Sequence, residues 1–258
     1  MKKICWKIIG QGNINLILIH GWGLNSKIWN LLLNYITDDF KCYIIDLPGS
    51  GINKHWKCKN IENTVKTLHY YMPNNAVWLG WSMGSLIAKH LALSFPKAIK
   101  AIISICSSPC FIKKSSWPGI KKDTLSKFYT ELSKNYTKTI KSFLKFQTLI
   151  TEPSINRALL THQCNKILSD SKPEQSTLKN NFKFILNSDY RQSLLNLKIP
   201  LLRIYGTLDS LVPIQIAEIL DIMYPNSYSY IIKKSAHMPF LSHPKLLASI
   251  LLRFKQNL

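Results

Sequence analysis

The chain has 258 residues, 46% of them hydrophobic, and its 34 Lys and Arg against 13 Asp and Glu give a formal net charge of +21. A chain of this length and apolar content buries a large core, so it is one domain, or one with an insertion, and is excluded from the disordered class. No apolar run approaches the ~20 residues that cross a bilayer, so a membrane-spanning helix is excluded and a soluble protein is expected.

The first ten residues combine two lysines with an apolar stretch, but Lys7 interrupts that stretch and no small-residue cleavage site follows, so export is not expected. Six scattered cysteines show neither a C-x-x-C pair nor zinc-ligand spacing: Cys5, Cys42, Cys58, Cys106, Cys110 and Cys164. They are expected to be reduced thiols that bind no metal, in a cytoplasmic protein. The alternative is a disulfide or metal pair formed by Cys106 and Cys110.

Short apolar runs recur along the chain at residues 15–20, 41–46, 76–79, 98–105, 200–205 and 228–232. Continuous apolar runs of this length are typical of strands buried on both faces. Most of the segments between them carry apolar residues at helical spacing, such as Met83, Ile87 and Leu91. Strand and helix in alternation predict an α/β fold with a mostly parallel central sheet flanked by helices.

The alternation stops between residues 111 and 187, where no strand run is found. Leu125, Phe128, Leu132 and Tyr136 begin a helical period there, and the strand pattern resumes at Pro200. We therefore expect residues 1–110 and 188–258 to form one core and residues 111–187 to form a helical cap inserted into it.

The pentapeptide GWSMG at residues 80–84 follows a predicted strand and precedes a predicted helix. In that order the pattern G-x-S-x-G is typical of a strained turn that exposes a nucleophilic serine, with glycines relieving the crowding around it. Ser82 is therefore the candidate nucleophile. The alternative is an ordinary glycine-rich turn between strand and helix.

A serine nucleophile needs a base and an acid that orients the base. His237 follows the last predicted strand and is the candidate base, with His243 as the second choice. Asp209 follows the strand at 200–205 and is the candidate acid, the alternative being a solvated turn aspartate. The chain order Ser82, Asp209, His237 is that of α/β-hydrolases.

Two backbone N–H groups are expected to stabilise an oxyanion. The N–H of Met83 lies at the start of the helix after Ser82. The N–H of Trp22 lies in the loop HGWG at residues 20–23, which follows the first predicted strand. His20 in the same loop is expected to brace the loop and not to act as a base.

Together these motifs resemble the α/β-hydrolase superfamily and, more narrowly, the pimeloyl-acyl-carrier-protein methyl ester carboxylesterases of bacterial biotin synthesis. The resemblance covers nearly the whole chain. Its motifs, in order, are HGWGLN, DLPGSG, WLGWSMG, SSPCF followed by WPGIK, FLKFQT, RIYGTLDSLVP and AHMPFLSHP. Ser85, where glycine is usual, and Ser50, where an aromatic residue is usual, depart from the family pattern.

The resemblance implies hydrolysis of the methyl ester of pimeloyl-acyl carrier protein to the free acid and methanol, without a metal or organic cofactor. The substrate-binding residues it implies are Trp22, Ser82, Met83, Phe143, Leu144, Lys145, Phe146, Gln147 and His237. The helical spacing of Phe143 and Phe146 suits an apolar acyl channel, with packing inside the cap as the alternative.

The resemblance also implies an acidic carrier protein as partner, docked on Lys138, Lys141, Lys145 and Arg157, with Lys166 nearby. Ser142, Ile155 and Leu159 stand where the family has arginines. The positive charge has a second explanation, because a chain rich in Lys, Ile and Asn is also produced by drift toward AT-rich codons. The dispersed lysines and the absence of a binding motif disfavour nucleic acid as a partner, and a monomer that binds no membrane is expected.

Three other functions remain open from the sequence. A broad-specificity short-chain carboxylesterase has the same triad, because a triad does not identify its acyl group. A non-catalytic protein that uses the pocket as a receptor is the alternative of another class. A basic nucleic-acid binder is the third.

Overall fold

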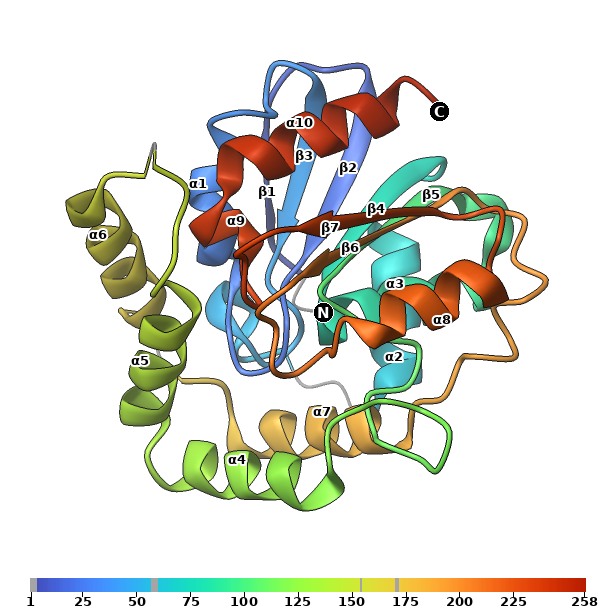
Figure 1. Cartoon of the computed structure of the whole chain (residues 1–258). Helices are drawn as coiled ribbons and strands as arrows, with labels where there is room; N and C mark the ends of the chain where they lie inside the picture. The colour runs from blue at the N-terminus through green and yellow to red at the C-terminus, as the bar shows by residue number, and fades with distance from the viewer. Residues whose placement is uncertain (1–3, 57–59, 154, 170–171) are drawn as a thin grey trace.

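A seven-stranded sheet forms the centre of the computed structural model, which describes residues 4–56, 60–153, 155–169 and 172–258. The strand order is β1-β3-β2-β4-β5-β6-β7, and only β1 runs antiparallel to its neighbour (Figure 1). The strands are β1 (Trp6–Ile9), β2 (Ile14–Ile19), β3 (Phe40–Ile45), β4 (Ala76–Trp81), β5 (Ile99–Ile105), β6 (Leu201–Gly206) and β7 (Tyr228–Ile232). The predicted α/β fold with a mostly parallel sheet is confirmed.

The buried strands divide their side chains between two layers. In β2, Leu16 and Leu18 join the apolar cluster on one face, whereas Ile17 and Ile19 join the cluster on the other. The same burial on both faces holds along β4 and β6. This explains why the sequence shows continuous apolar runs instead of alternation. The sequence did not predict β1, an edge strand of four residues that is half-buried to exposed and contains Lys7.

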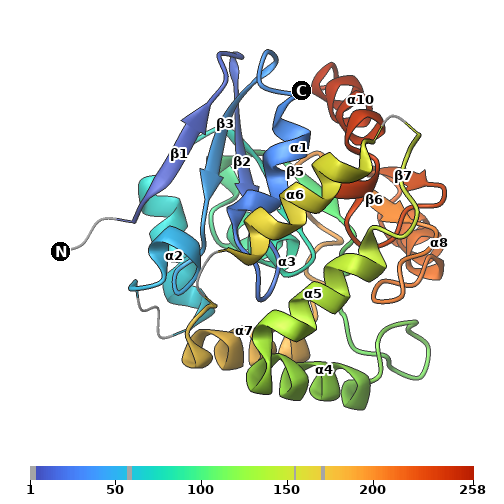
Figure 2. The same ribbon diagram turned by 90° about the vertical axis from the view of Figure 1, so that its left-hand side faces the viewer.

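Helices cover both faces of the sheet (Figure 2). On one face lie α1 (Asn30–Leu33), α9 (Pro239–Ser242) and α10 (Pro244–Lys255), and on the other lie α2 (Ile61–Tyr71), α3 (Met83–Ser94) and α8 (Gln215–Met223). Short 3₁₀ turns form η1 (Ser26–Trp29), η2 (Gly51–Asn53) and η3 (Pro96–Ala98). In the described part of the chain, no helix combines the length and the apolarity that a bilayer crossing requires.

Four further helices lie in the segment that was predicted as a cap. They are α4 (Lys122–Lys134), α5 (Tyr136–Gln147), α6 (Arg157–Leu168) and α7 (Gln175–Asn187). The side chains of Asn135 and Asn156 accept backbone hydrogen bonds at the N-termini of α5 and α6, which explains where these two helices begin. In Figure 1, α4 and α7 lie side by side below the sheet, and α5 and α6 continue up one side.

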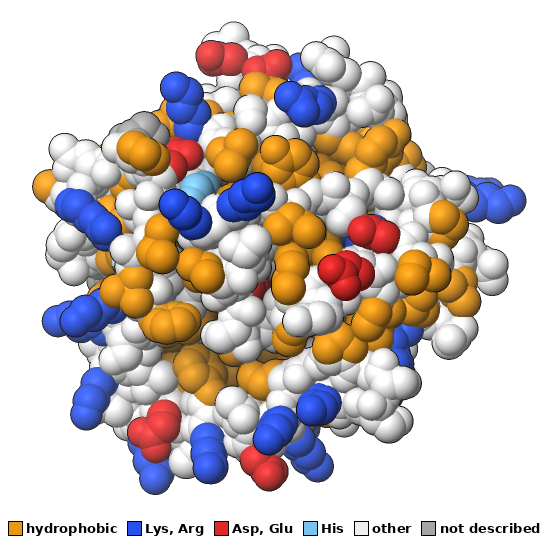
Figure 3. All heavy atoms as spheres, viewed as in Figure 1, with side chains coloured by type: hydrophobic (Ala, Val, Ile, Leu, Met, Phe, Trp, Pro, Cys, Tyr) orange, Lys and Arg blue, Asp and Glu red, His pale blue; other side chains and the backbone are white. Residues whose placement is uncertain are grey.

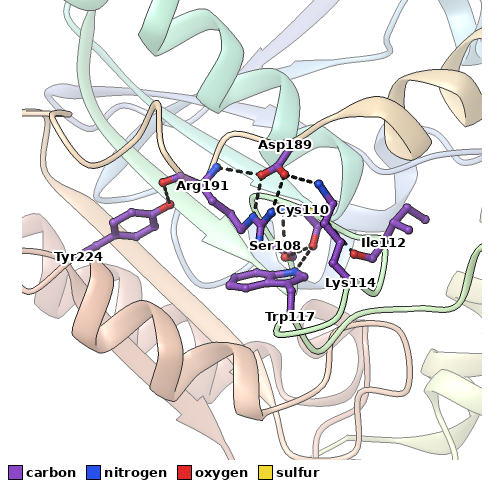
Figure 4. A network of polar contacts seen from close by, with 8 residues as sticks. All are labelled: Ser108, Cys110, Ile112, Lys114, Trp117, Asp189, Arg191 and Tyr224. Atoms are coloured by element: carbon purple, nitrogen blue, oxygen red, sulfur yellow. Dashed lines mark hydrogen bonds and ion pairs between the residues drawn. The ribbon is translucent and has the colours of Figure 1, made fainter.

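A network of polar contacts joins the two ends of this helical segment (Figure 4). The Asp189 carboxylate, just after α7, accepts hydrogen bonds from Lys114 Nζ at 2.6 Å and from the Arg191 guanidinium at 2.8 Å. Arg191 also lies 5.0 Å from the ring centroid of Trp117, whose indole N–H donates to the carbonyl of Cys110 at 2.7 Å. The two cations hold the pKa of Asp189 well below its usual range. These contacts therefore hold the start and the end of the helical segment next to each other where it joins the core.

Candidate active site

Ser82 occupies a strained turn between β4 and α3. Its φ of 54° and ψ of −119° lie in a region that non-glycine residues rarely adopt. A Cβ at Gly80 would clash with the backbone of Gly84, and one at Gly84 would clash with the carbonyl of Ile19. The Ser82 N–H donates to the Ile105 carbonyl at 3.0 Å, and the Ser107 hydroxyl donates to the Ser82 carbonyl at 2.9 Å. The turn is thus fixed on both sides, at the edge of the sheet where the parallel strands end.

The predicted base and acid are in direct contact. His237 Nδ1 lies 2.7 Å from Asp209 Oδ2, and both side chains are buried. Asp209 Oδ1 accepts the backbone N–H groups of Leu211 at 2.8 Å and Val212 at 3.0 Å. A carboxylate only accepts hydrogen bonds, so the ring proton of His237 lies on Nδ1, facing Asp209. Nε2 is then left as an acceptor.

Ser82 and His237 line the same cavity. In the described part of the chain, the serine hydroxyl and the imidazole are not hydrogen-bonded to each other. Catalytic hydrogen bonds of this kind often tighten only when substrate binds. Two of the three predicted residues are therefore paired, and the third faces the same space.

The backbone of His237 is also held from both sides. Its N–H donates to Gln147 Oε1 at 2.7 Å, and its carbonyl accepts the indole N–H of Trp81 at 2.7 Å. Gln147 was expected to contact substrate, and the structure adds that it fastens the base to α5. The sequence did not predict the contact of Trp81, because it joins residues 156 positions apart.

The two predicted oxyanion donors follow neighbouring parallel strands, β2 and β4. Met83 is the first residue of α3, where backbone N–H groups have no partner within the helix. The Trp22 indole donates to the Leu178 carbonyl at 3.1 Å and packs against Phe128 and Phe182, which ties this loop to α4 and α7.

His20 braces its loop as expected. Its Nε2 accepts the Leu47 N–H at 2.9 Å, and its Nδ1 lies 2.8 Å from the Gly21 carbonyl, to which it donates. Burial lowers the pKa of His20 and keeps the ring neutral. A neutral ring with both nitrogens engaged is a structural element of the loop.

A cavity of about 740 Å³ opens in front of Ser82 and His237. On the side of the core it is lined by Trp22, Trp81, Ser82, Ser210, Leu211 and His237. On the side of the cap its apolar lining includes Phe111, Ile120, Leu125, Phe128, Phe143 and Phe146. The cap also contributes polar and charged side chains, among them Lys127, Glu131, Asn135 and Lys138. A cavity that is mostly apolar and carries some polar groups is the ordinary form of a site for a small molecule or an acyl chain.

The residues of the stretch 143–147, which the resemblance implies as substrate contacts, do not all face the same surface. Phe143, Phe146 and Gln147 line the cavity, but Leu144 packs into the apolar core and Lys145 is exposed to solvent. Successive residues of a helix point about 100° apart, so five consecutive residues of α5 cannot all face the same side.

The lysines expected to dock an acidic partner differ in their surroundings. Lys138 lines the cavity, whereas Lys141, Lys145 and Lys166 are exposed. The Arg157 guanidinium donates to the carbonyls of Thr148 at 2.8 Å and Leu149 at 3.2 Å, so it joins α6 to the end of α5. Figure 3 shows Lys and Arg side chains dispersed over one face, without a continuous basic field.

A buried lysine lies behind the strained turn. Lys89 on α3 donates from Nζ to Ser104 Oγ at 3.0 Å, and the Ser85 hydroxyl donates to the same oxygen at 2.6 Å. Burial and the nearby charge of Arg203 lower the pKa of Lys89 to about 7. Arg203 itself pairs with Asp221 at 2.6 Å. Ser85, one of the departures from the family pattern, is therefore part of a polar cluster below the turn.

Replacing Lys89 with methionine is expected to stabilise the protein at pH 7 by on the order of a few kcal/mol, because it removes the cost of burying a charge. Above pH 7 the folded lysine is neutral while the unfolded one, with its pKa near 10.5, still binds a proton. Wild-type stability therefore rises with pH in this window, and the advantage of the variant shrinks toward about pH 10. Urea unfolding of both proteins across that range measures the difference.

A difference between Lys89→Met and wild type that stays constant with pH would show that the folded lysine keeps its ordinary pKa. Taking the difference removes the titration of other groups, such as Tyr205, whose pKa burial raises to about 12. Lys97 belongs to an exposed turn, so Lys97→Met is the matched control and is expected to leave stability unchanged within about 0.5 kcal/mol.

None of the five described cysteines forms a disulfide, and Cys58 lies outside the described residues. Cys110 donates toward the carbonyl of Ile112, whereas Cys106 lies next to the pair of Asp209 and His237. The alternative of a bond between Cys106 and Cys110 is therefore not realised.

Comparison with known proteins supports the same fold. A family model described as alpha/beta hydrolase fold matches residues 14–244. A hydrolase from Oleispira antarctica is 23% identical, with a TM-score of 0.81, covering 100% of this chain and 96% of the other. An esterase from Exiguobacterium antarcticum is 18% identical, with a TM-score of 0.83 and coverages of 98% and 95%. The esterase RhEst1 from a Rhodococcus species is 20% identical, with a TM-score of 0.76 and coverages of 97% and 94%.

Proposed function

The chain belongs to the α/β-hydrolase family, and from this we propose that it is a serine carboxylesterase with Ser82 as nucleophile, His237 as base and Asp209 as acid. The observation that carries the proposal is the pairing of His237 with Asp209 at the wall of a cavity that Ser82 also lines. A receptor without catalysis has no need for a strained serine turn beside a buried carboxylate–imidazole pair.

In the proposed reaction, Ser82 Oγ attacks the ester carbonyl while His237 Nε2 takes the serine proton. The Asp209 carboxylate stabilises the imidazolium that forms. The N–H groups of Trp22 and Met83 hold the oxyanion. The imidazolium then donates its proton to the leaving alcohol. Water, activated by the same base, hydrolyses the acyl-enzyme and restores Ser82.

For the substrate, we propose the methyl ester of pimeloyl-acyl carrier protein, which the resemblance of the whole chain implies. The apolar cavity suits the methylene chain, and Lys138 at the cavity and exposed Lys141 suit an acidic carrier. Lysine supplies long-range attraction without the two-pronged geometry of arginine. The broad-specificity short-chain carboxylesterase remains the second candidate, because a triad does not identify its acyl group.

The test incubates pimeloyl-acyl-carrier-protein methyl ester with the enzyme and follows the intact mass of the carrier. Rapid loss of one CH₂ mass with wild type, and none with Ser82→Ala, supports the substrate and the nucleophile. Unchanged carrier mass with hydrolysis of p-nitrophenyl esters favours the broad-specificity esterase. If neither ester is cleaved and a fluorophosphonate does not label Ser82, the proposal of an esterase is wrong.

Phe143→Ala is expected to lower kcat/KM for p-nitrophenyl octanoate about tenfold and for p-nitrophenyl acetate about twofold. Phe143 lines the cavity, with its ring 6.0 Å from that of Phe128 and 6.4 Å from that of His237. Removing such a ring takes away apolar contact worth about 1.5–3 kcal/mol for a chain that reaches it. Steady-state kinetics with the two esters measures the ratio.

Lys145→Ala is the matched control, because it changes the same helix on its solvent-exposed side. It is expected to leave both esters within about twofold of wild type. Equal losses on both esters in Phe143→Ala would instead show that the ring positions His237 and does not bind the acyl chain.

A further inference from the structure

Cys106 lies beside the proposed acid and base, but the proposed reaction gives it no role. Its Sγ, a carboxylate oxygen of Asp209 and a ring nitrogen of His237 all lie within 4.8 Å of one another. All three residues are buried, and they come from three segments, the ends of β5 and β6 and the loop after β7. Across the described residues, this is the one group of at least three His, Cys, Asp or Glu side chains so placed.

Cys106 has a backbone conformation that is unfavourable for a residue with a side chain. Its φ of 45° lies in the left-handed region, which is costly for a residue with a side chain. The Cys106 N–H donates to the Ile204 carbonyl at 2.8 Å, which ties it to β6 and so to the strand that leads to Asp209. The thiol donates to the Ala236 carbonyl at 3.8 Å, which fixes its sulfur within 4.8 Å of a carboxylate oxygen of Asp209. The three ligand atoms are therefore held together by the sheet itself.

The chemistry of the three groups fits a borderline-soft divalent cation. Thiolate, imidazole and carboxylate are the ligands of Zn²⁺, whereas Mg²⁺ and Ca²⁺ prefer oxygen alone. With the thiol deprotonated, thiolate and carboxylate supply two negative charges against the two positive charges of the ion. A neutral complex avoids the cost of a net charge in a buried place.

We propose that Cys106, Asp209 and His237 form an inhibitory binding site for Zn²⁺, a regulation that rests on the proposed function of the same residues. On binding, the Cys106 thiol releases its proton to solvent and the sulfur coordinates the ion together with the Asp209 carboxylate. His237 binds through Nδ1, so its ring proton moves to Nε2. That nitrogen then cannot accept the proton of Ser82, and hydrolysis stops.

Without the ion, the thiol stays protonated. Burial and the charge of Asp209 raise the pKa of Cys106 well above its usual value, so the thiol keeps its proton and donates weakly to the Ala236 carbonyl. A bound divalent cation reverses this, because a coordinating thiol is deprotonated outright. His237 lines the cavity, whereas Cys106 and Asp209 do not and are buried, so an ion reaches the three groups only when the His237 ring moves.

The test of binding uses Co²⁺ as a spectroscopic substitute for Zn²⁺. The whole chain carrying Ser82→Ala is titrated, with and without Cys106→Ser, and the near-ultraviolet thiolate-to-cobalt band is recorded. Ser82→Ala is expected to show the band, and Cys106→Ser to weaken binding at least tenfold. Cys164→Ser, which alters a half-buried thiol elsewhere, is the matched control and keeps the band. Equal bands with and without Cys106 would overturn the site.

The test of inhibition titrates p-nitrophenyl acetate hydrolysis with Zn²⁺ in wild type, Cys106→Ser and Cys106→Ala, each relative to its own rate without metal. The concentration for half inhibition is expected to rise at least tenfold in both variants. Cobalt binding that depends on Cys106, combined with activity that Zn²⁺ leaves intact, would overturn the inhibitory role. If the protein cleaves no ester, the proposed function fails, and the cobalt titration still decides the site.

Discussion

Ser82→Ala is expected to lower ester hydrolysis by about 10⁵-fold or more, because the nucleophile and its base act as one unit. Alanine keeps the backbone bonds that fix the turn, including the bond from the Ser107 hydroxyl to the carbonyl at position 82. The loss is therefore expected in kcat, with the melting temperature unchanged. Steady-state hydrolysis of p-nitrophenyl acetate and labelling by a fluorophosphonate measure it.

Ser142→Ala is the matched control for this variant, because Ser142 also lines the cavity but is exposed on α5. Its kcat is expected to stay within about twofold of wild type. Residual activity above one hundredth of wild type in Ser82→Ala, or fluorophosphonate labelling at another residue, would identify a different nucleophile.

Asp209→Asn is expected to lower kcat by about 10⁴-fold with little change in the fold. The amide oxygen can still accept the N–H groups of Leu211 and Val212, so the NH₂ group is left facing His237 Nδ1. An amide donor at that nitrogen moves the ring proton to Nε2, and the ring then cannot take the proton of Ser82.

The pH profile of kcat separates a change in which His237 nitrogen carries the proton from general damage to the fold. Asp123→Asn changes an exposed aspartate in the first turn of α4 and is expected to leave kcat within about twofold of wild type. A loss of less than tenfold in Asp209→Asn would mean that another group orients the base.

The residues of the proposed triad were predictable from the sequence because each lies in a short local pattern. Ser82 is enclosed by two glycines, and Asp209 and His237 follow apolar runs that end at one edge of a parallel sheet. The sheet was predictable for the same reason, since strands buried on both faces leave continuous apolar runs. The edge strand β1 was missed because its four residues mix exposed and half-buried side chains.

The contacts around the triad were not predictable, because they join distant parts of the chain. Gln147 reaches the His237 N–H across 90 residues, and Trp81 reaches the His237 carbonyl across 156. Sequence periodicity predicted α5. The resemblance implied residues 143–147 as one set of substrate contacts and gave no indication that Leu144 faces the core. From the sequence, Cys106 was considered only together with Cys110, and its place beside Asp209 and His237 was not predictable because it depends on the order of the strands.

The strand order also governs when a growing chain gains the machinery for hydrolysis. The turn at Ser82 has all the partners that fix it once β4, α3, β5 and Ser107 have been synthesised, but β5 keeps an open edge until β6 is made after the whole of α4–α7. Asp209 and His237 arrive only with β6 and β7. A nascent chain on the ribosome thus carries its serine without a base. Reactivity toward a fluorophosphonate would mark the moment at which the sheet closes during synthesis.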